Sequence, residues 1–197
     1  MNENQTHEQN GKARLLRPRL RLYHANPKGT GCAVTMELHP AHDETAGSIM
    51  MSVANQLTKG DRRGPNPAFP TFDWENKITV KLEFADLCRI LQVLRGECES
   101  LEGDRGIYHQ TAWAKTQIVF RHLISPVAGY SLDLFRVLKT GEDQRAHFHF
   151  YPEEALGLLE AISGSMAIVT FGIPMVIPHD TSSYKAGNRE GRDVRAA

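Results

Sequence analysis

The chain has 197 residues, with 23 basic and 23 acidic side chains, so its formal net charge is zero. This length allows one well-buried domain with tails, and a neutral molecule exerts no overall electrostatic pull on nucleic acid or membrane. The hydrophobic content of 41% and the charged content of 23% are ordinary for a globular protein, and we count no apolar run of membrane-spanning length. The three cysteines form no CxxC pair, which indicates free thiols.

The two ends of the chain differ in composition from its middle. Residues 1–18 are polar and then basic, and they are predicted to be a disordered arm. They lack the apolar core of a signal peptide, which predicts a cytoplasmic protein, and they do not form a transit peptide, which predicts a bacterial or viral one, with nucleoid association as an option. Residues 19–173 are predicted to form the folded domain, and residues 174–197 a flexible tail.

Alternation of apolar and polar residues predicts four strands in the first half of the chain. We expect them at 19–24, 33–39, 48–57 and 77–84. From Phe84 the apolar residues follow a helical stripe, and Gly96 is a plausible stop for that helix. A loop rich in glycine and proline, residues 58–70, precedes the fourth strand.

The second half repeats this order. Strands are expected at 106–113, 115–124, 129–138 and 145–150, and Pro152 with two following glutamates marks the start of a helix. Gly164 follows that helix as Gly96 follows the first, and residues 166–173 either extend the helix or wrap the core. The sequence thus predicts an internally duplicated α+β fold, in which each β-β-β-β-α half forms a four-stranded antiparallel sheet.

Cations and aromatic residues recur on the predicted strands and their turns. A groove that follows phosphates with cations and stacks bases on aromatic rings is what a single-stranded nucleic acid requires. The candidates for nucleic-acid binding are Arg19, Arg21, Tyr23, Lys28, Trp74, Lys77, Thr79, Lys81, Tyr108, Trp113, Lys115 and Arg121.

An alternative from another class is a metal-dependent β-fold enzyme. His147 and His149 share one face of a predicted strand, as pairs of zinc ligands do, although no further ligand has a fixed spacing to them. No nucleophile elbow, Walker loop or dinucleotide-binding glycine motif is present in the sequence. We therefore assign no catalytic residue, metal or cofactor and predict a protein that is not an enzyme.

Several short motifs resemble the Whirly proteins of plants. Phe72-Asp73-Trp74-Glu75-Asn76-Lys77 is similar to the Tyr-Asp-Trp-Ser-Arg-Lys segment of that family, and residues 27–34 resemble its Lys-Gly-Lys-Ala-Ala-Leu stretch. Residues 129–134 and then 148–162 follow in matching order, so the likeness extends from about Leu20 to Phe171. Thr30 stands where the family has its second lysine, which puts the oligomer-linking role of that stretch in doubt.

The resemblance implies a homotetramer that binds single-stranded DNA with little sequence preference and acts in genome maintenance or transcription. It implies two blade-like sheets and a tetramer core formed by the helices. Lys28, Trp74 and Lys77 match motif residues. Packing within and between subunits is expected from Leu87, Leu91, Leu94, Leu156, Leu159 and Ile162. Related folds leave RNA binding or a transcription-coactivator role as alternatives.

Overall fold

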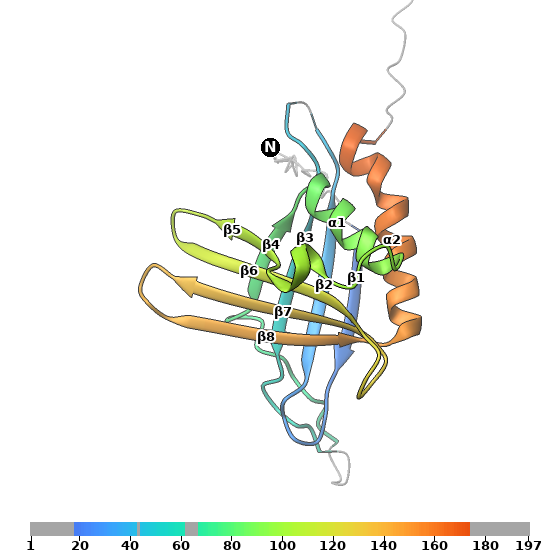
Figure 1. The fold of residues 1–197 in the computed structure, drawn as a ribbon. Coiled ribbons are helices and arrows are strands. Elements are labelled where there is room, and N and C mark those ends of the chain that lie inside the picture. Colours follow the sequence, from blue (N-terminus) through green and yellow to red (C-terminus); the bar gives the residue numbers. More distant parts are fainter. Residues whose placement is uncertain (1–17, 43, 62–66, 174–197) are drawn as a thin grey trace, which may run out of the picture.

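The computed structural model describes residues 18–42, 44–61 and 67–173. They form two four-stranded antiparallel sheets, each followed by a helix (Figure 1). The first sheet has the order β1-β2-β3-β4 and the second the order β5-β6-β7-β8. The predicted fold class and its internal duplication are confirmed. The predicted arm and tail, except Pro18, lie outside the described residues.

The strand positions follow the alternation in the sequence closely. The first sheet contains β1 (Arg19–His24), β2 (Cys32–His39), β3 (Ser48–Asn55) and β4 (Ile78–Leu82). The second contains β5 (Ile107–Gln110), β6 (Ala114–Leu123), β7 (Gly129–Leu138) and β8 (Asp143–Phe150). A short 3₁₀ turn, η1 (Leu101–Asp104), lies in the acidic segment before β5 and was not predicted.

The helices are α1 (Phe84–Leu94) and α2 (Pro152–Phe171). The helix α1 ends just before Gly96, as predicted. The helix α2 instead continues through Gly164, because Ile162 and Val169 on either side of it are buried and hold the helix against the core. Packing of this kind outweighs the cost of about 1 kcal/mol for a glycine inside a helix. The extension over residues 166–171 is therefore helical, one of the two predicted options.

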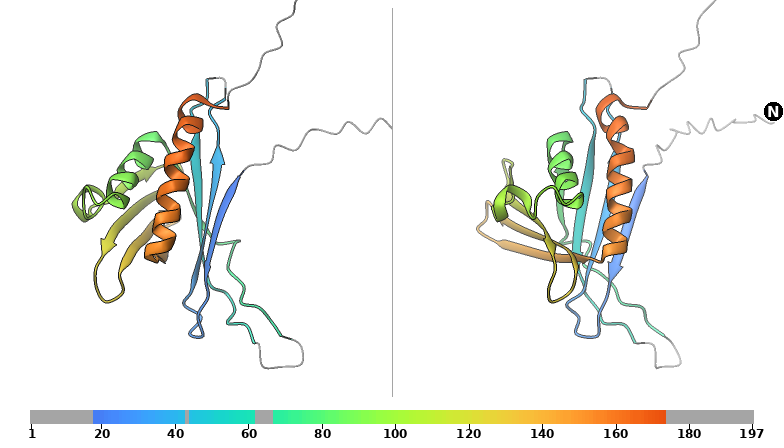
Figure 2. Two further views of the ribbon diagram at one scale, coloured as in Figure 1. Left: turned by 90° about the vertical axis from the view of Figure 1, so that its right-hand side faces the viewer. Right: turned by 45° about the vertical axis from the view of Figure 1, so that its right-hand side comes forward.

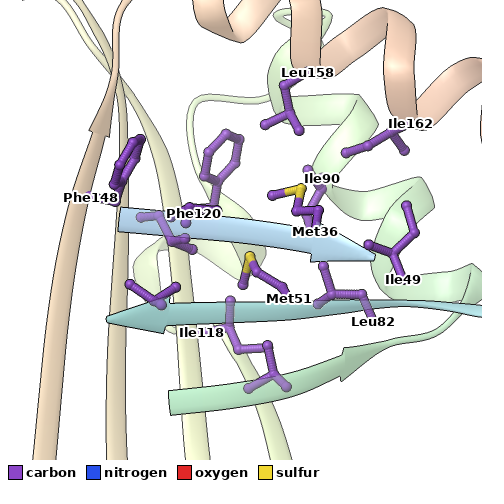
Figure 3. Packing of buried hydrophobic residues seen from close by; sticks show 14 of the residues in the cluster. Met36, Ile49, Met51, Leu82, Ile90, Ile118, Phe120, Phe148, Leu158 and Ile162 are labelled. Carbon is purple, nitrogen blue, oxygen red and sulfur yellow. The ribbon is translucent and has the colours of Figure 1, made fainter. Parts of the chain in front are cut away.

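One hydrophobic core joins both sheets and both helices. Leu158 and Ile162 of α2 lie with Met36 and Ile49 of the first sheet, and Ile90 of α1 packs beside them (Figure 3). Both helices and the second sheet lie on the same side of the first sheet (Figure 2). No described helix or strand covers the opposite side of the first sheet.

The surface of α2 is unusually apolar. Only 22% of its most apolar stretch is buried, and by length and composition it is the one described helix that could cross a membrane. The expectation of no apolar run of that length is wrong by this measure. Core helices of globular proteins pass the same test, and α2 contributes Ala155, Leu158 and Ile162 to this core.

Candidate nucleic-acid interface

The open side of β1–β4 carries the first group of predicted binding residues, and we name it the sheet-1 face. Strand register sets Arg19, Glu37, Met50 and Lys81 in one row and Arg21, Thr35, Ser52 and Thr79 in the next. Alternation makes this arrangement possible, since Leu20, Leu22 and their counterparts turn to the core. Ser52 and Thr79 are hydrogen-bonded across the sheet at 2.9 Å.

Aromatic rings gather at one end of the sheet-1 face. The ring centroid of Tyr23 lies 5.6 Å from that of Phe72 and 6.4 Å from that of Trp74, and Trp74 meets Tyr23 edge-on. These three residues, with Ala25 and the segment from Phe69 to Thr71, line an open cavity of about 620 Å³. Tyr23 is 52% exposed and Phe69 is 72% exposed, so rings remain available for stacking.

The segment that enters β4 is fixed by Asp73. Its side chain accepts hydrogen bonds from the backbone N–H of Asn76 (3.1 Å) and from the Asn76 side-chain amide (2.9 Å). These bonds to Asn76 lower the pKa of Asp73. The Asp73 N–H in turn donates to the carbonyl of Asn55 at 2.8 Å. This hydrogen-bonded turn therefore fixes the backbone around Trp74 and leads to Lys77, the residue before β4.

Carboxylates partly neutralise the positive charge of the sheet-1 face. Glu37 pairs with Arg19 and lies 3.0 Å from His39, and Lys81 donates to Glu83 at 2.9 Å. The hydrogen bond and charge of Lys81 lower the pKa of Glu83. Within the described parts of the chain, Arg21 and Lys77 have no ion-pair partner. Phosphates would thus meet two unpaired cations and two exchangeable ion pairs.

The outward side chains of β5–β8 form a second surface, which we name the sheet-2 face. Its central row is Tyr108, Gln117, Phe135 and Arg145, and the next row is Gln110, Lys115, Val137 and Asp143. The guanidinium of Arg145 lies 5.6 Å from the ring centroid of Phe135. Trp113, in the turn between β5 and β6, is 74% exposed.

The structure divides the predicted residues between these two surfaces. Arg19, Arg21, Tyr23, Thr79 and Lys81 share the sheet-1 face, with Trp74 and Lys77 at its margin and Lys28 in the β1–β2 turn. Tyr108, Lys115 and Arg121 belong to the sheet-2 face. Since both sheets turn their inner sides to one core, the two faces are separate outer surfaces of the subunit.

Sequence reasoning missed several residues of these surfaces. Phe69 lines the aromatic cavity, and Phe135 and Arg145 complete the central row of the sheet-2 face. The outward position of Phe135 was readable from the alternation in β7, where Leu134 is buried. Phe69 carried no comparable signal, because it lies in a loop without periodicity.

The two strand histidines have other partners than a metal ion. His147 is hydrogen-bonded through Nδ1 to Asp133 Oδ1 at 2.7 Å, and His149 Nε2 lies 3.2 Å from the carbonyl of Ala128. Across the described ranges, no group of three or more His, Cys, Asp or Glu side chains is placed to hold a metal. Burial raises the pKa of the Cys32 thiol to about 11, so that thiol remains protonated at neutral pH.

The six residues predicted for packing within and between subunits separate by burial. Leu87, Leu91, Leu94 and Ile162 are buried in the core of the single subunit, so they pack within it. Leu159 is half-buried against the same core. Leu156 is 61% exposed and is the member of this set that is open to a partner.

Together these features define an α+β protein made of two sheet-and-helix units, with cations and aromatic rings on the outer sides of both sheets. Solved structures of plant Whirly proteins have this fold. The WHY1 structure from Arabidopsis thaliana matches with a TM-score of 0.57 and 16% identity, over 92% of this chain and 100% of that one. The resemblance noted in the sequence is confirmed at the level of the fold.

Two further structures give the same result. The plant transcriptional regulator PBF-2 matches with a TM-score of 0.57 and 18% identity, over 78% of this chain and 82% of its own. WHY3 from Arabidopsis thaliana matches with a TM-score of 0.57 and 16% identity, over 86% and 95%. No protein-family model matches the sequence, and no curated protein is significantly similar to it.

Proposed function

We propose that this protein is not an enzyme but a single-stranded DNA-binding protein with little sequence preference, acting in genome maintenance or transcription. The observation that supports this most strongly is the sheet-1 face, where cations border an open cavity of aromatic rings. The fold supports it too, since the plant transcriptional regulator PBF-2 shares it.

The sheet-1 face suits phosphates along its length. Arg21 and Lys77 can bind a phosphate directly. Arg19 and Lys81 would first leave their ion pairs with Glu37 and Glu83 and bind a phosphate instead. Each phosphate neutralised on a single strand releases condensed counterions and adds about 0.7 to the slope of log affinity against log salt. Binding that falls steeply with salt is therefore the expected signature.

The aromatic cavity suits bases without selecting among them. Tyr23, Phe72 and Trp74 offer ring faces and edges, and every base has a face that stacks. A base stacked on such a ring contributes on the order of 1–3 kcal/mol. A duplex keeps its bases stacked on each other, so it should bind much more weakly to this surface.

We further propose that subunits associate through the exposed apolar side of α2, with a homotetramer as the expected assembly. Leu156 and Phe171 are exposed on this helix, and Phe84 is exposed at the start of α1. Association would bury this surface and leave the sheet-1 face open, because the helices and that face lie on opposite sides of the first sheet (Figure 2).

Fluorescence anisotropy with labelled oligothymidine, its duplex and the matching RNA, over a salt series, tests the proposal. We expect tight single-strand binding that weakens with salt and poor duplex binding. Lys77→Ala should reduce the salt slope by about 0.7. Arg95→Ala, which removes an exposed cation at the end of α1, should leave affinity and slope unchanged.

The two tryptophans of the chain distinguish the two surfaces. Trp113→Phe leaves Trp74 as the reporter of the aromatic cavity, and Trp74→Phe leaves Trp113 as the reporter of the sheet-2 side. A fluorescence change at Trp74 on adding oligothymidine places the strand on the sheet-1 face. Absence of binding to any of the three probes at low salt would refute the proposed function.

A further inference from the structure

Gln56, just after β3, is a buried glutamine with all of its amide bonding capacity in use. The residue is 8% exposed. Its Oε1 accepts from the N–H groups of Asn26 (2.8 Å) and Gly31 (3.1 Å), and its Nε2 donates to the carbonyls of Asn26 (3.1 Å) and Thr58 (2.9 Å). A buried amide satisfied at four points holds whatever it joins in one geometry.

These bonds join two loops that carry binding residues. Asn26 and Gly31 are the two ends of the β1–β2 turn, and Lys28 lies between them. The Gln56 backbone adds to the joint, since its N–H donates to the Gly31 carbonyl at 2.8 Å and the residue forms a β-bridge with Phe72. Phe72 is the ring that lies against Tyr23 in the aromatic cavity.

The joint has no spare room. A Cβ on Gly31 would lie 2.1 Å from the carbonyl oxygen of His24 and 2.3 Å from Oε1 of Gln56. At Gly29, whose φ is +79°, a Cβ would lie 3.1 Å from Cε of Lys59. The stem of Lys59 therefore runs along the turn that carries Lys28, and the two lysines share one end of the sheet-1 face.

We propose that Gln56 is a positioning residue of the nucleic-acid site: it fixes the turn of Lys28 and the ring of Phe72 before a strand arrives. The inference rests on the proposed function of the sheet-1 face. Loops that are already ordered do not need to be ordered by the ligand, so affinity is gained without any contact between Gln56 and nucleic acid.

A glutamine meets this need better than its close relatives. The joint presents two N–H donors and two carbonyl acceptors, and a carboxamide matches both pairs. A carboxylate would accept from the two N–H groups but would face two carbonyl oxygens without a donor. A methionine would fill the space and leave all four backbone groups without this partner.

Hydrogen exchange of the wild-type protein, with and without oligothymidine, is the first test. We expect the amides of Asn26 and Gly31, which donate to Gln56 Oε1, to be protected already in the free protein, with little further gain on binding. Protection that develops only in the complex would overturn the inference, since the ligand would then order the loops.

Gln56→Met provides the second test, with Gln92→Met on the exposed side of α1 as the matched control. We expect faster exchange in both loops, an unchanged active fraction and about tenfold weaker binding. The salt slope should fall as it does in Lys28→Ala, and the double variant should lose little more. A lower active fraction with an unchanged slope and affinity would mean that Gln56 matters only for folding.

The two proposals fail in different ways. If the wild-type protein binds no oligonucleotide, the proposed function fails and the role of Gln56 fails with it. If the wild type binds and Gln56→Met binds equally well with loosened loops, only the role of Gln56 is refuted.

Discussion

His147 and Asp133 favour each other's charged forms on the sheet-2 face. The hydrogen bond to Asp133 raises the pKa of His147 above the ordinary value of 6.5, against the opposing effects of burial and of Arg121. Burial alone would raise the pKa of Asp133, but the hydrogen bond and charge of His147, with the charge of Arg121, lower it below 3.8. Both members of the pair are therefore mostly charged between these two ordinary values.

This pair makes a prediction about pH. His147 has a raised folded-state pKa, so its stabilising effect is complete below pH 6.5 and is lost as the pH rises through that folded-state pKa. Asp133 has a lowered pKa, so its effect is complete above pH 3.8 and is lost as the pH falls through the folded-state value. Stability differences between wild type and Asp133→Asn should thus be largest between pH 3.8 and 6.5.

Histidine titration by NMR measures the pair directly. Asp133→Asn should lower the pKa of His147 towards its ordinary value. Arg121→Gln should shift it in the opposite direction, because the charge of Arg121 lowers that pKa in the wild type. Shifts of the same sign in the two variants would contradict this account.

At the scale of elements, the two helices begin with the same pair of contacts, a helix cap and a carboxylate–histidine hydrogen bond. Asp86 in the first turn of α1 accepts from the Glu83 N–H at 3.1 Å and meets His109 of β5 at 3.0 Å. Glu154 in the first turn of α2 accepts from the Tyr151 N–H at 3.0 Å and meets His24 of β1 at 2.7 Å. Each helix start is thus tied to the first strand of the other half.

Because the start of α2 is tied to β1 through Glu154, removing neighbouring carboxylates should lower stability by unequal amounts. Glu154→Ala should lower the free energy of unfolding by about 1–2 kcal/mol, because it removes a helix cap and leaves His24 without its partner. Glu153→Ala, one residue earlier and exposed, should cost less than about 1 kcal/mol through the helix dipole alone. Urea unfolding measures the stability of the two variants, and equal losses would show that the contacts of Glu154 with His24 and Tyr151 add nothing to it.

The elements also show what the sequence could predict. Bounds of β1 and β7 follow from alternation to the residue, since one side of each strand packs against the core and the pattern records it. The end of α2 was open, because whether Gly164 stops a helix depends on what its neighbours pack against. Gln56 gave no signal, since its four partners lie in loops that only the tertiary structure brings together.

At the scale of the whole molecule, the limit of prediction was the relation between the sheets. Alternation assigns Tyr23 and Tyr108 to outer faces, but it cannot say how these faces lie relative to each other. The tertiary structure makes them separate outer surfaces around the single core shared by both sheets. The candidate residues are therefore divided between two surfaces in space, and their role in binding stays a prediction.

The exposed side of α2 carries the last prediction. Leu156 is 61% exposed and Phe171 is 85% exposed on a helix that buries only one side against the core, and such exposed apolar area is costly for a subunit alone in water. Leu156→Glu should weaken association by at least about tenfold, because a charge would have to be buried against apolar side chains. Light scattering with size-exclusion chromatography measures the mass.

The matched control is Ile124→Glu, which places the same charge at an exposed apolar residue outside α2, in the loop after β6. It should leave the mass unchanged, and both variants should keep wild-type circular dichroism. If wild type and Leu156→Glu have the same mass, α2 is not the interface. Because the sheet-1 face lies on the far side of the first sheet, a dissociated subunit should still bind oligothymidine. Its affinity for long strands should fall more than its affinity for short ones, since linked sites on one strand bind cooperatively through proximity.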